Sequence, residues 1–209
     1  PQNHETKKYL NSLGVKKIKF LGNLKFSESK TQKNIALNKN IEKIFKSRKI
    51  WCAVSTHNGE EKICAEAHQK LKKKYKKLLT VIIPRHVHRV NDIYKEILDM
   101  GFKVQIHSKK SKIKKDTDIY LVDTYGETKS FFKICNTVFL GGSIVNHGGQ
   151  NPLEPARFGC KILHGPYVQN FTEVYNLLEK NNLSSKFNNI DQLINLINQS
   201  FIKKTNFAN

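Results

Sequence analysis

From about residue 49 onward, short apolar segments alternate regularly with longer amphipathic ones, and this alternation constrains the fold more than any other feature of the chain. The apolar segments predict buried strands at 51–55, 78–84, 102–106, 118–123, 137–142 and 161–165. The amphipathic segments predict helices at 59–75, 88–100, 126–135, 171–180 and 191–201, and one starting at Pro152. Such alternation is typical of parallel βαβ units. We therefore expect an α/β fold, a Rossmann-like doubly wound parallel sheet.

The first 48 residues do not fit this regular pattern. Residues 4–13 predict a short helix ending at Gly14, and VKKIKFLG (15–22) alternates apolar and basic residues like a partly covered strand. We assign 1–22 to a preceding domain, 23–48 to a linker and a first helix at 35–45, and 49–209 to the Rossmann-like domain. The chain begins at Pro1 without a signal-peptide pattern, so we expect a piece of a longer protein.

The composition is that of a globular protein. Hydrophobic residues make up 38% of the 209 residues, and no apolar run approaches the length of a membrane helix, so we expect a soluble chain with a real core. The four cysteines are far apart and form no Cys-x-x-Cys pair, which predicts buried, reduced thiols. His86 and His88 have the spacing of a metal pair, but no third ligand follows nearby, so we expect no metal and no other cofactor.

The net charge of +20 predicts attraction to phosphate-bearing partners, including anionic lipid head groups. Lysines outnumber arginines 33 to 4, although base reading and bidentate phosphate binding favour arginine. We therefore do not expect a nucleic-acid partner. The rare arginines, Arg85 and Arg157 in particular, are candidates for tasks that lysine cannot perform.

Four polar loops follow predicted strands, at 55–60, 84–86, 123–127 and 141–154. Because ligands of open α/β sheets bind at the carboxyl ends of the strands, we expect these loops to form one binding site. Arg85 follows a very apolar strand and would project its guanidinium toward a phosphate. Ser55 and Thr56 could donate to a phosphate or a sugar, whereas Glu60 and Glu61 are expected to stabilise the start of a helix.

The loop at 141–154 carries the densest signal. Asn151 before Pro152 matches an N-cap and a first helical position. Gly148 and Gly149 remove side chains next to this helix start, and Gly142 and Ser143 offer bare amides and a hydroxyl, which together predict an anion site. Glu154 has two open interpretations: a capping contact to the Asn151 amide, or acceptance of hydrogen bonds from a ribose.

No nucleophile motif, Walker loop, zinc-protease motif or G-x-G-x-x-G occurs in the chain. The residues by themselves therefore predict a nucleotide- or phosphate-binding domain of unspecified chemistry.

Seven segments resemble the C-terminal half of bacterial 3-deoxy-D-manno-octulosonic acid (Kdo) transferases, which have a GT-B glycosyltransferase fold. They are GNLKF (22–26), STHNGEE (55–61), IPRH (83–86), DTYGE (123–127), FLGGS (139–143), HGGQNPLEPARFG (147–159) and HGPYVQNF (164–171). The resemblance implies transfer of Kdo from CMP-Kdo to a lipid A precursor in lipopolysaccharide biosynthesis, at the cytoplasmic face of the inner membrane. It also implies that the catalytic base is a glutamate of an N-terminal acceptor domain outside this chain, so the chain alone should bind nucleotide without catalysing transfer.

Carried over residue by residue, the family's donor-binding segments fall on Pro84, Arg85, Tyr125, Gly126, Glu127, Gly142, Ser143, Asn151, Pro152, Leu153 and Glu154. Tyr125 and Gln150 depart from the methionine and histidine expected there. Two alternatives stay open: a GT-B domain for a uridine- or guanosine-linked sugar, and a basic nucleic-acid-binding module.

Overall fold

The computed structural model describes residues 4–19, 37–109 and 113–202 and divides the chain into two compact units, Pro1–Lys33 and Asn34–Asn209. In the first unit, helix α1 (His4–Ser12) ends before Gly14, whose φ of 81° suits a glycine. The strand predicted at 15–22 is not formed over 15–19, and residues 20–22 lie outside the described part. Alternation alone does not make a strand, because a strand needs a neighbour to hydrogen-bond with. The assignment of 1–22 to a preceding domain stays a prediction.

The second unit contains one sheet with the strands β1 (Lys49–Thr56), β2 (Leu78–Pro84), β3 (Val104–Ile106), β4 (Ile119–Leu121), β5 (Thr137–Leu140), β6 (Lys161–His164) and β7 (Ser184–Lys186). The strand pairings in the described part of the chain are all parallel, and the order is β3-β4-β2-β1-β5-β6-β7. The predicted doubly wound sheet is confirmed. The chain first builds outward from β1 on one side and then returns to pair β5 with its other side, so the topological switch point lies between β1 and β5.

The helices of this unit are α2 (Lys39–Lys46), α3 (Glu60–Lys72), α4 (Val90–Asp99), α5 (Thr128–Phe132), α6 (Leu153–Arg157), α7 (Thr172–Lys180) and α8 (Ile190–Ile202), with single 3-10 turns η2 (Val87–Arg89), η3 (His107–Lys109) and η4 (Gln169–Phe171). Each predicted helix is present. Helix α2 starts later than predicted because the Asn38 side chain accepts a hydrogen bond from the Asn40 amide and caps it there. Strand β7 escaped prediction because SSK is short and polar.

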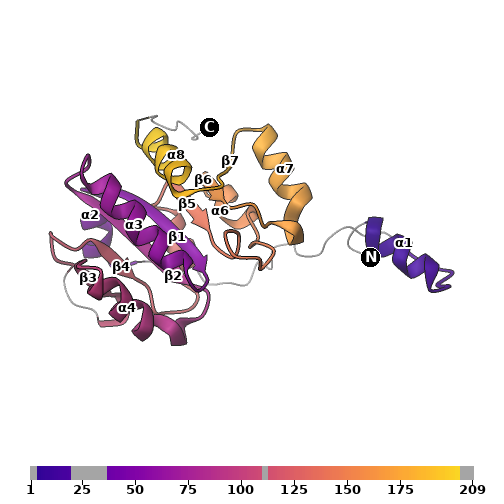
Figure 1. Cartoon of the computed structure of the whole chain (residues 1–209), viewed down its shortest axis with the longest axis horizontal. Helices are drawn as coiled ribbons and strands as arrows, with labels where there is room; N and C mark the ends of the chain where they lie inside the picture. Colours follow the sequence, from indigo (N-terminus) through magenta and orange to yellow (C-terminus); the bar gives the residue numbers. More distant parts are fainter. Residues whose placement is uncertain (1–3, 20–36, 110–112, 203–209) are drawn as a thin grey trace. The chain divides into compact units, whose positions relative to one another are not determined.

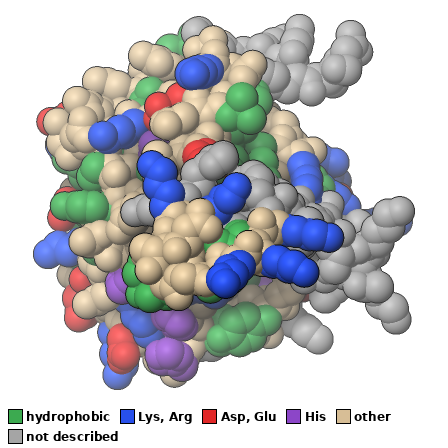
Figure 2. Space-filling view, turned by 90° about the vertical axis from the view of Figure 1, so that its right-hand side faces the viewer, with side chains coloured by type: hydrophobic (Ala, Val, Ile, Leu, Met, Phe, Trp, Pro, Cys, Tyr) green, Lys and Arg blue, Asp and Glu red, His purple; other side chains and the backbone are tan. Residues whose placement is uncertain are grey.

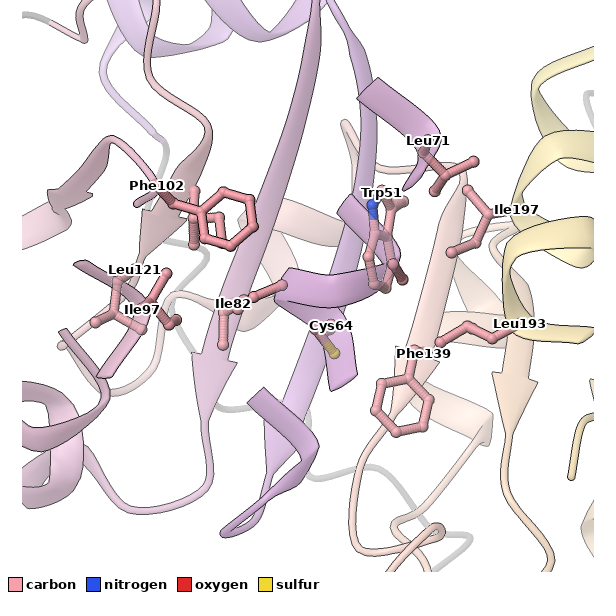
Figure 3. Packing of buried hydrophobic residues seen from close by; sticks show 14 of the residues in the cluster. Trp51, Cys64, Leu71, Ile82, Ile97, Phe102, Leu121, Phe139, Leu193 and Ile197 are labelled. Carbon is pink, nitrogen blue, oxygen red and sulfur yellow. The ribbon is translucent and has the colours of Figure 1, made fainter. Parts of the chain in front are cut away.

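Helices cover both faces of the sheet, so the central strands are apolar on both sides (Figure 1). On one face, Trp51 and Phe139 pack beneath Leu71 of α3 and Ile197 of α8 (Figure 3). On the other face, Phe45 of α2 makes an edge-to-face contact with Tyr120 at 5.4 Å between ring centroids. All four cysteines are free and buried, as predicted. This double packing fixes the strand ends on which the polar loops are carried.

Among the described residues, no helix is both long and apolar enough to span a bilayer.

Candidate functional site

Three of the four predicted loops meet at the switch point. The Arg85 amide donates a 3.0 Å hydrogen bond to the Thr56 carbonyl, which joins the ends of β2 and β1. The His57 ring stacks on His147 with 4.2 Å between centroids, and its edge faces His86 at 5.8 Å. The loops at 55–60, 84–86 and 141–154 are therefore in direct contact at the carboxyl edge of the sheet.

The fourth loop, 123–127, is held mainly by the neighbouring end of β3. Glu127 lies 2.9 Å from His107 Nε2 and accepts a hydrogen bond from the Thr124 hydroxyl, so its carboxylate is engaged within the protein. Tyr125 is 71% exposed, and Gly126 has a φ of 82°. The link to the 141–154 loop runs through α5, where Lys129 Nζ lies 3.8 Å from Glu154 Oε1.

Gly142 and Ser143 do not offer the bare amides that we predicted. Their amides donate to the Glu60 carboxylate at 2.8 and 3.2 Å, and the Ile144 and His57 amides donate to it at 3.0 and 2.9 Å. The Ser143 hydroxyl donates to the Leu140 carbonyl and accepts from the Gly165 amide. Glu60 is fully buried, so an acid of this protein occupies the place predicted for a ligand.

Gly148 and Gly149 also differ from the prediction of amides open to a ligand. Both are buried with positive φ values, and the Gly149 amide donates to the Gly142 carbonyl at 2.8 Å. A Cβ at Gly148 would lie 2.2 Å from the Asn170 side chain, and one at Gly149 would lie 3.1 Å from Val168. These glycines are required by backbone conformation and by close packing against the loop that follows β6.

The start of α6 agrees with the predicted cap but not with the predicted dipole. Asn151 Oδ1 accepts a hydrogen bond from the Leu153 amide at 3.1 Å, and the buried Pro152 directly precedes the helix. However, α6 has only five residues, so it contributes little of the positive potential that a longer helix has at its N-terminus. Both interpretations of Glu154, whose side chain is 40% exposed, stay predictions.

Ser55 and Thr56 occupy an irregular end of β1. Ser55 has a φ of 55°, and the pairing of β1 with β2 shifts register between Val54 and Thr56. Thr56 is fully buried, and its hydroxyl has no hydrogen-bond partner among the described residues, so its donation to a phosphate or a sugar stays a prediction. The strained backbone turns the Thr56 side chain into the interior instead of toward the edge.

Arg85 directly follows strand β2 as the sequence predicts, whereas its contact with a phosphate stays a prediction. It follows the buried Pro84 at the end of β2, it is exposed, and no ion pair to it is found among the described residues. The neighbouring Arg89, which the sequence did not single out, is used internally: it contacts both oxygens of the buried Glu61 at 3.0 and 3.2 Å. Burial of two consecutive acids after a glycine is not visible in sequence periodicity, because Glu60 and Glu61 look like ordinary first-turn residues.

The carboxyl edge is cationic around His57. Burial and, to a smaller extent, the positive potential of His147, His86, Arg89 and Arg85 together lower the pKa of His57 to about 4. The Nε2 atom of His57 is buried and has no hydrogen-bond partner in the part of the chain that the structure describes. Figure 2 shows histidine side chains gathered at one end of the face in view, with lysines and arginines scattered over the rest. An arriving anion would meet complementary potential here.

No group of three or more His, Cys, Asp or Glu side chains in the described part of the chain is arranged to hold a metal ion. A hollow of about 290 Å³ lies at the opposite edge of the sheet, where β1 and β5 begin. Lys46, Arg48, Lys49 and Asn136 line it together with Phe45 and Phe201, and it contains none of the predicted site residues.

The chain is 33% identical over 163 residues to the 3-deoxy-D-manno-octulosonic acid transferase of Haemophilus influenzae, a match that covers 78% of this chain and 38% of that protein. This chain is a relative of the Kdo transferases. The enzyme of the same name from Aquifex aeolicus is 30% identical over 183 residues, covering 88% of this chain and 48% of the relative. The chain thus spans less than half the length of these Kdo transferases, and no family model matches it.

The fold is shared with a crystal structure described as the C-terminal CMP-Kdo binding domain of WaaA from Acinetobacter baumannii. The TM-score is 0.73 at 23% identity, over 77% of this chain and 84% of that domain. The prediction of the C-terminal fold of a GT-B glycosyltransferase is confirmed. The roles of individual side chains in binding a ligand stay predictions.

Proposed function

We propose that this chain is the donor-binding half of a Kdo transferase and that it binds CMP-Kdo at the carboxyl edge of the sheet, around Arg85 and the histidines His57, His86 and His147. The observation that carries the proposal is the 33% identity with the Haemophilus influenzae enzyme over 163 residues. The exposed guanidinium beside the switch point supports it, because a cytidylate carries one phosphate that a planar fork can bind in bidentate fashion.

In the proposed reaction, the acceptor hydroxyl oxygen forms a bond to the anomeric carbon of Kdo, the bond from that carbon to the phosphate oxygen breaks, and cytidylate leaves with the bonding electrons. The negative charge on the phosphate must then be met by groups already in place, and Arg85 with the surrounding cationic potential supplies this. The base that deprotonates the acceptor hydroxyl belongs, by the family resemblance, to an N-terminal domain outside this chain. The chain alone would bind the donor without transferring the sugar.

The acceptor in this proposal is a lipid A precursor, bound by that N-terminal domain at the cytoplasmic face of the bacterial inner membrane. The net charge of +20 would hold the complete enzyme against the anionic leaflet. Vesicle binding by the complete enzyme should fall when salt is raised or anionic lipid is omitted, and binding indifferent to both would contradict this part of the proposal.

Calorimetric titration of CMP into the chain, with UMP and GMP as competitors, tests the nucleotide assignment. We expect CMP to bind most tightly and Arg85→Ala to weaken its binding roughly 30-fold, the effect of about 2 kcal/mol from one charge-assisted bidentate contact. The CMP affinity of Arg85→Lys should lie between those of the wild type and Arg85→Ala, because lysine keeps the charge but lacks the planar guanidinium that can bind two phosphate oxygens.

Lys70→Ala provides the matched control, since this cation on α3 is paired with Asp191 in an exposed ion pair. It should leave CMP affinity unchanged. Equal affinity for UMP or GMP would favour another nucleotide-sugar. Steeply salt-dependent binding of an oligonucleotide with no nucleotide preference would favour the nucleic-acid alternative.

A further inference from the structure

Glu60 is the first residue of α3 and is fully buried at the switch point. Its Oε2 accepts the amides of His57 and Gly142, and its Oε1 accepts those of Ser143 and Ile144, at 2.8 to 3.2 Å. Four N–H donors directed at two oxygens use the side chain as an acceptor only, the role suited to an ionised carboxylate. This one side chain therefore ties the loop after β1 to the loop after β5.

The glycine next to this turn shows how closely Glu60 is fitted. A Cβ on Gly141 would lie 2.7 Å from Glu60 Oε2 and 2.4 Å from the Ser55 carbonyl oxygen. Both distances are far inside van der Waals contact, so only glycine allows the strand end and the carboxylate to approach in this way. The first glycine of the G-G-S sequence is explained by an internal contact.

Hydrogen bonds extend the positioning effect of Glu60 from the turn at 142–144 to Gly149, further along the loop at 141–154. The Gly142 amide is held by Glu60, and the Gly142 carbonyl accepts the Gly149 amide at 2.8 Å. Gly149 thus takes its position from Glu60 through one intervening residue. His57 receives its position more directly, because its own amide donates to the same carboxylate and its ring stacks on His147.

We propose that Glu60 is a positioning residue of the donor site: a resident anion that holds the 142–149 segment and His57 in the binding arrangement before the ligand arrives. The inference rests on the proposed function for its ligand. Its physical basis is preorganisation, since a loop fixed in advance loses less conformational entropy on binding. It also implies that the ligand phosphate is bound outside the 142–144 turn, whose amides are already engaged.

Glu60→Gln in the full chain tests the proposal. The amide offers one acceptor oxygen and places an NH₂ donor against N–H donors, so we expect CMP affinity to fall at least about tenfold. The amide proton signals of residues 142–144 should move in NMR spectra, and so should that of Gly149, whose amide donates to the Gly142 carbonyl and not to Glu60. Unchanged CMP affinity in a folded Glu60→Gln chain, or an unmoved Gly149 signal, would overturn the positioning role.

Two further variants separate positioning from general loss of stability. Asp118→Asn removes another nearly buried acid, at the amino edge of the sheet, and should lower the unfolding midpoint while changing CMP affinity by less than about twofold. If Glu60→Gln does not fold, Glu60→Asp keeps the charge on a shorter side chain, and an affinity equal to wild type would then overturn the proposal. If the wild-type chain does not bind CMP, the proposed function fails, while the Gly149 signal still decides whether Glu60 positions this loop.

Discussion

At the carboxyl edge of the sheet, the Glu60 carboxylate is held by four backbone amides, whereas at the amino edge Asp118 is held by Lys72, by the Lys103 amide at 3.0 Å and by His68 at 3.5 Å. Both acids are almost inaccessible to solvent. One is neutralised by peptide dipoles and the other mainly by a side-chain cation.

This difference decides which cations each edge leaves for a ligand. At the amino edge, Asp118 engages Lys72, and Arg48 donates to the carbonyls of Lys77, Leu78 and Thr117. At the carboxyl edge, no ion pair to Glu60 is found within the described ranges, and Glu61 pairs there with Arg89. In the proposed function, Arg85 is therefore the exposed cation assigned to the phosphate of the ligand.

The largest effect on the free energy of unfolding is expected at the ion pair between Arg89 and Glu61, at the carboxyl edge. Arg89→Ala leaves Glu61 buried without its partner, and we expect a loss of about 3 kcal/mol in the free energy of unfolding. Urea denaturation at pH 7 measures this. A loss below about 1 kcal/mol would show that Glu61 is stabilised by other groups and that the two edges differ less than we infer.

The second-largest effect is the contribution of Asp118, at the amino edge, to the free energy of unfolding, which is tested by lowering the pH. Burial opposes ionisation of Asp118, but the nearby His68 ring and the hydrogen bonds from Lys72 and the Lys103 amide outweigh it and hold the pKa of Asp118 well below its ordinary value. A depressed carboxyl pKa stabilises the folded state above the unfolded value near 4 and loses that contribution as the pH falls further. The contribution is about 2 kcal/mol, since Lys72 is partly exposed to solvent.

Urea denaturation of wild type and Asp118→Asn between pH 7 and pH 2.5 checks this prediction. The difference in the free energy of unfolding between the two proteins should be full at pH 7 and should begin to narrow below about pH 4. A gap that stays constant over this range would mean that Asp118 contributes by shape and not by charge.

The comparison also explains what the sequence could and could not predict. The strands 51–55 and 78–84 were predictable because they are predominantly apolar, and the position of Arg85 was predictable because a charged residue directly after such a strand must emerge at the sheet edge. The cap at Asn151 followed from local chemistry that needs no tertiary contact.

The use of the glycine amides was not predictable in this way. G-G-S and H-G-G look the same in sequence whether their amides face a ligand or an internal acceptor, and the acceptor Glu60 lies more than 80 residues from Gly142. The burial of Thr56 depends on a register shift in β1 that leaves no mark in the sequence pattern. Long-range partners of polar backbone groups are the part of a site that periodicity and spacing leave undetermined.

The smallest effect expected is the change in stability caused by the lowered pKa of a histidine, for which His68 at the amino edge and His57 at the carboxyl edge can be compared. Burial lowers the pKa of His68 at the amino edge and the pKa of His57 at the carboxyl edge, but only His57 also lies among His147, His86, Arg89 and Arg85. A histidine whose folded pKa is depressed stays neutral while the unfolded chain takes up a proton, so its folded state loses stability as the pH falls from about 6.5 toward 4. For the partly exposed His57 we expect a loss of about 1 kcal/mol.

An NMR titration of the histidine ring protons separates the two residues. His57 should titrate near 4 in the free chain. Its midpoint should rise when CMP is present, because a phosphate offsets the positive potential of the neighbouring histidines and arginines. His68 is fully buried and hydrogen-bonded to Thr80 at 2.9 Å, so its titration should not respond to CMP. A response at His68 and none at His57 would place the anion at the amino edge, next to the hollow lined by Lys46, Arg48 and Lys49, and would reverse the assignment of the two edges.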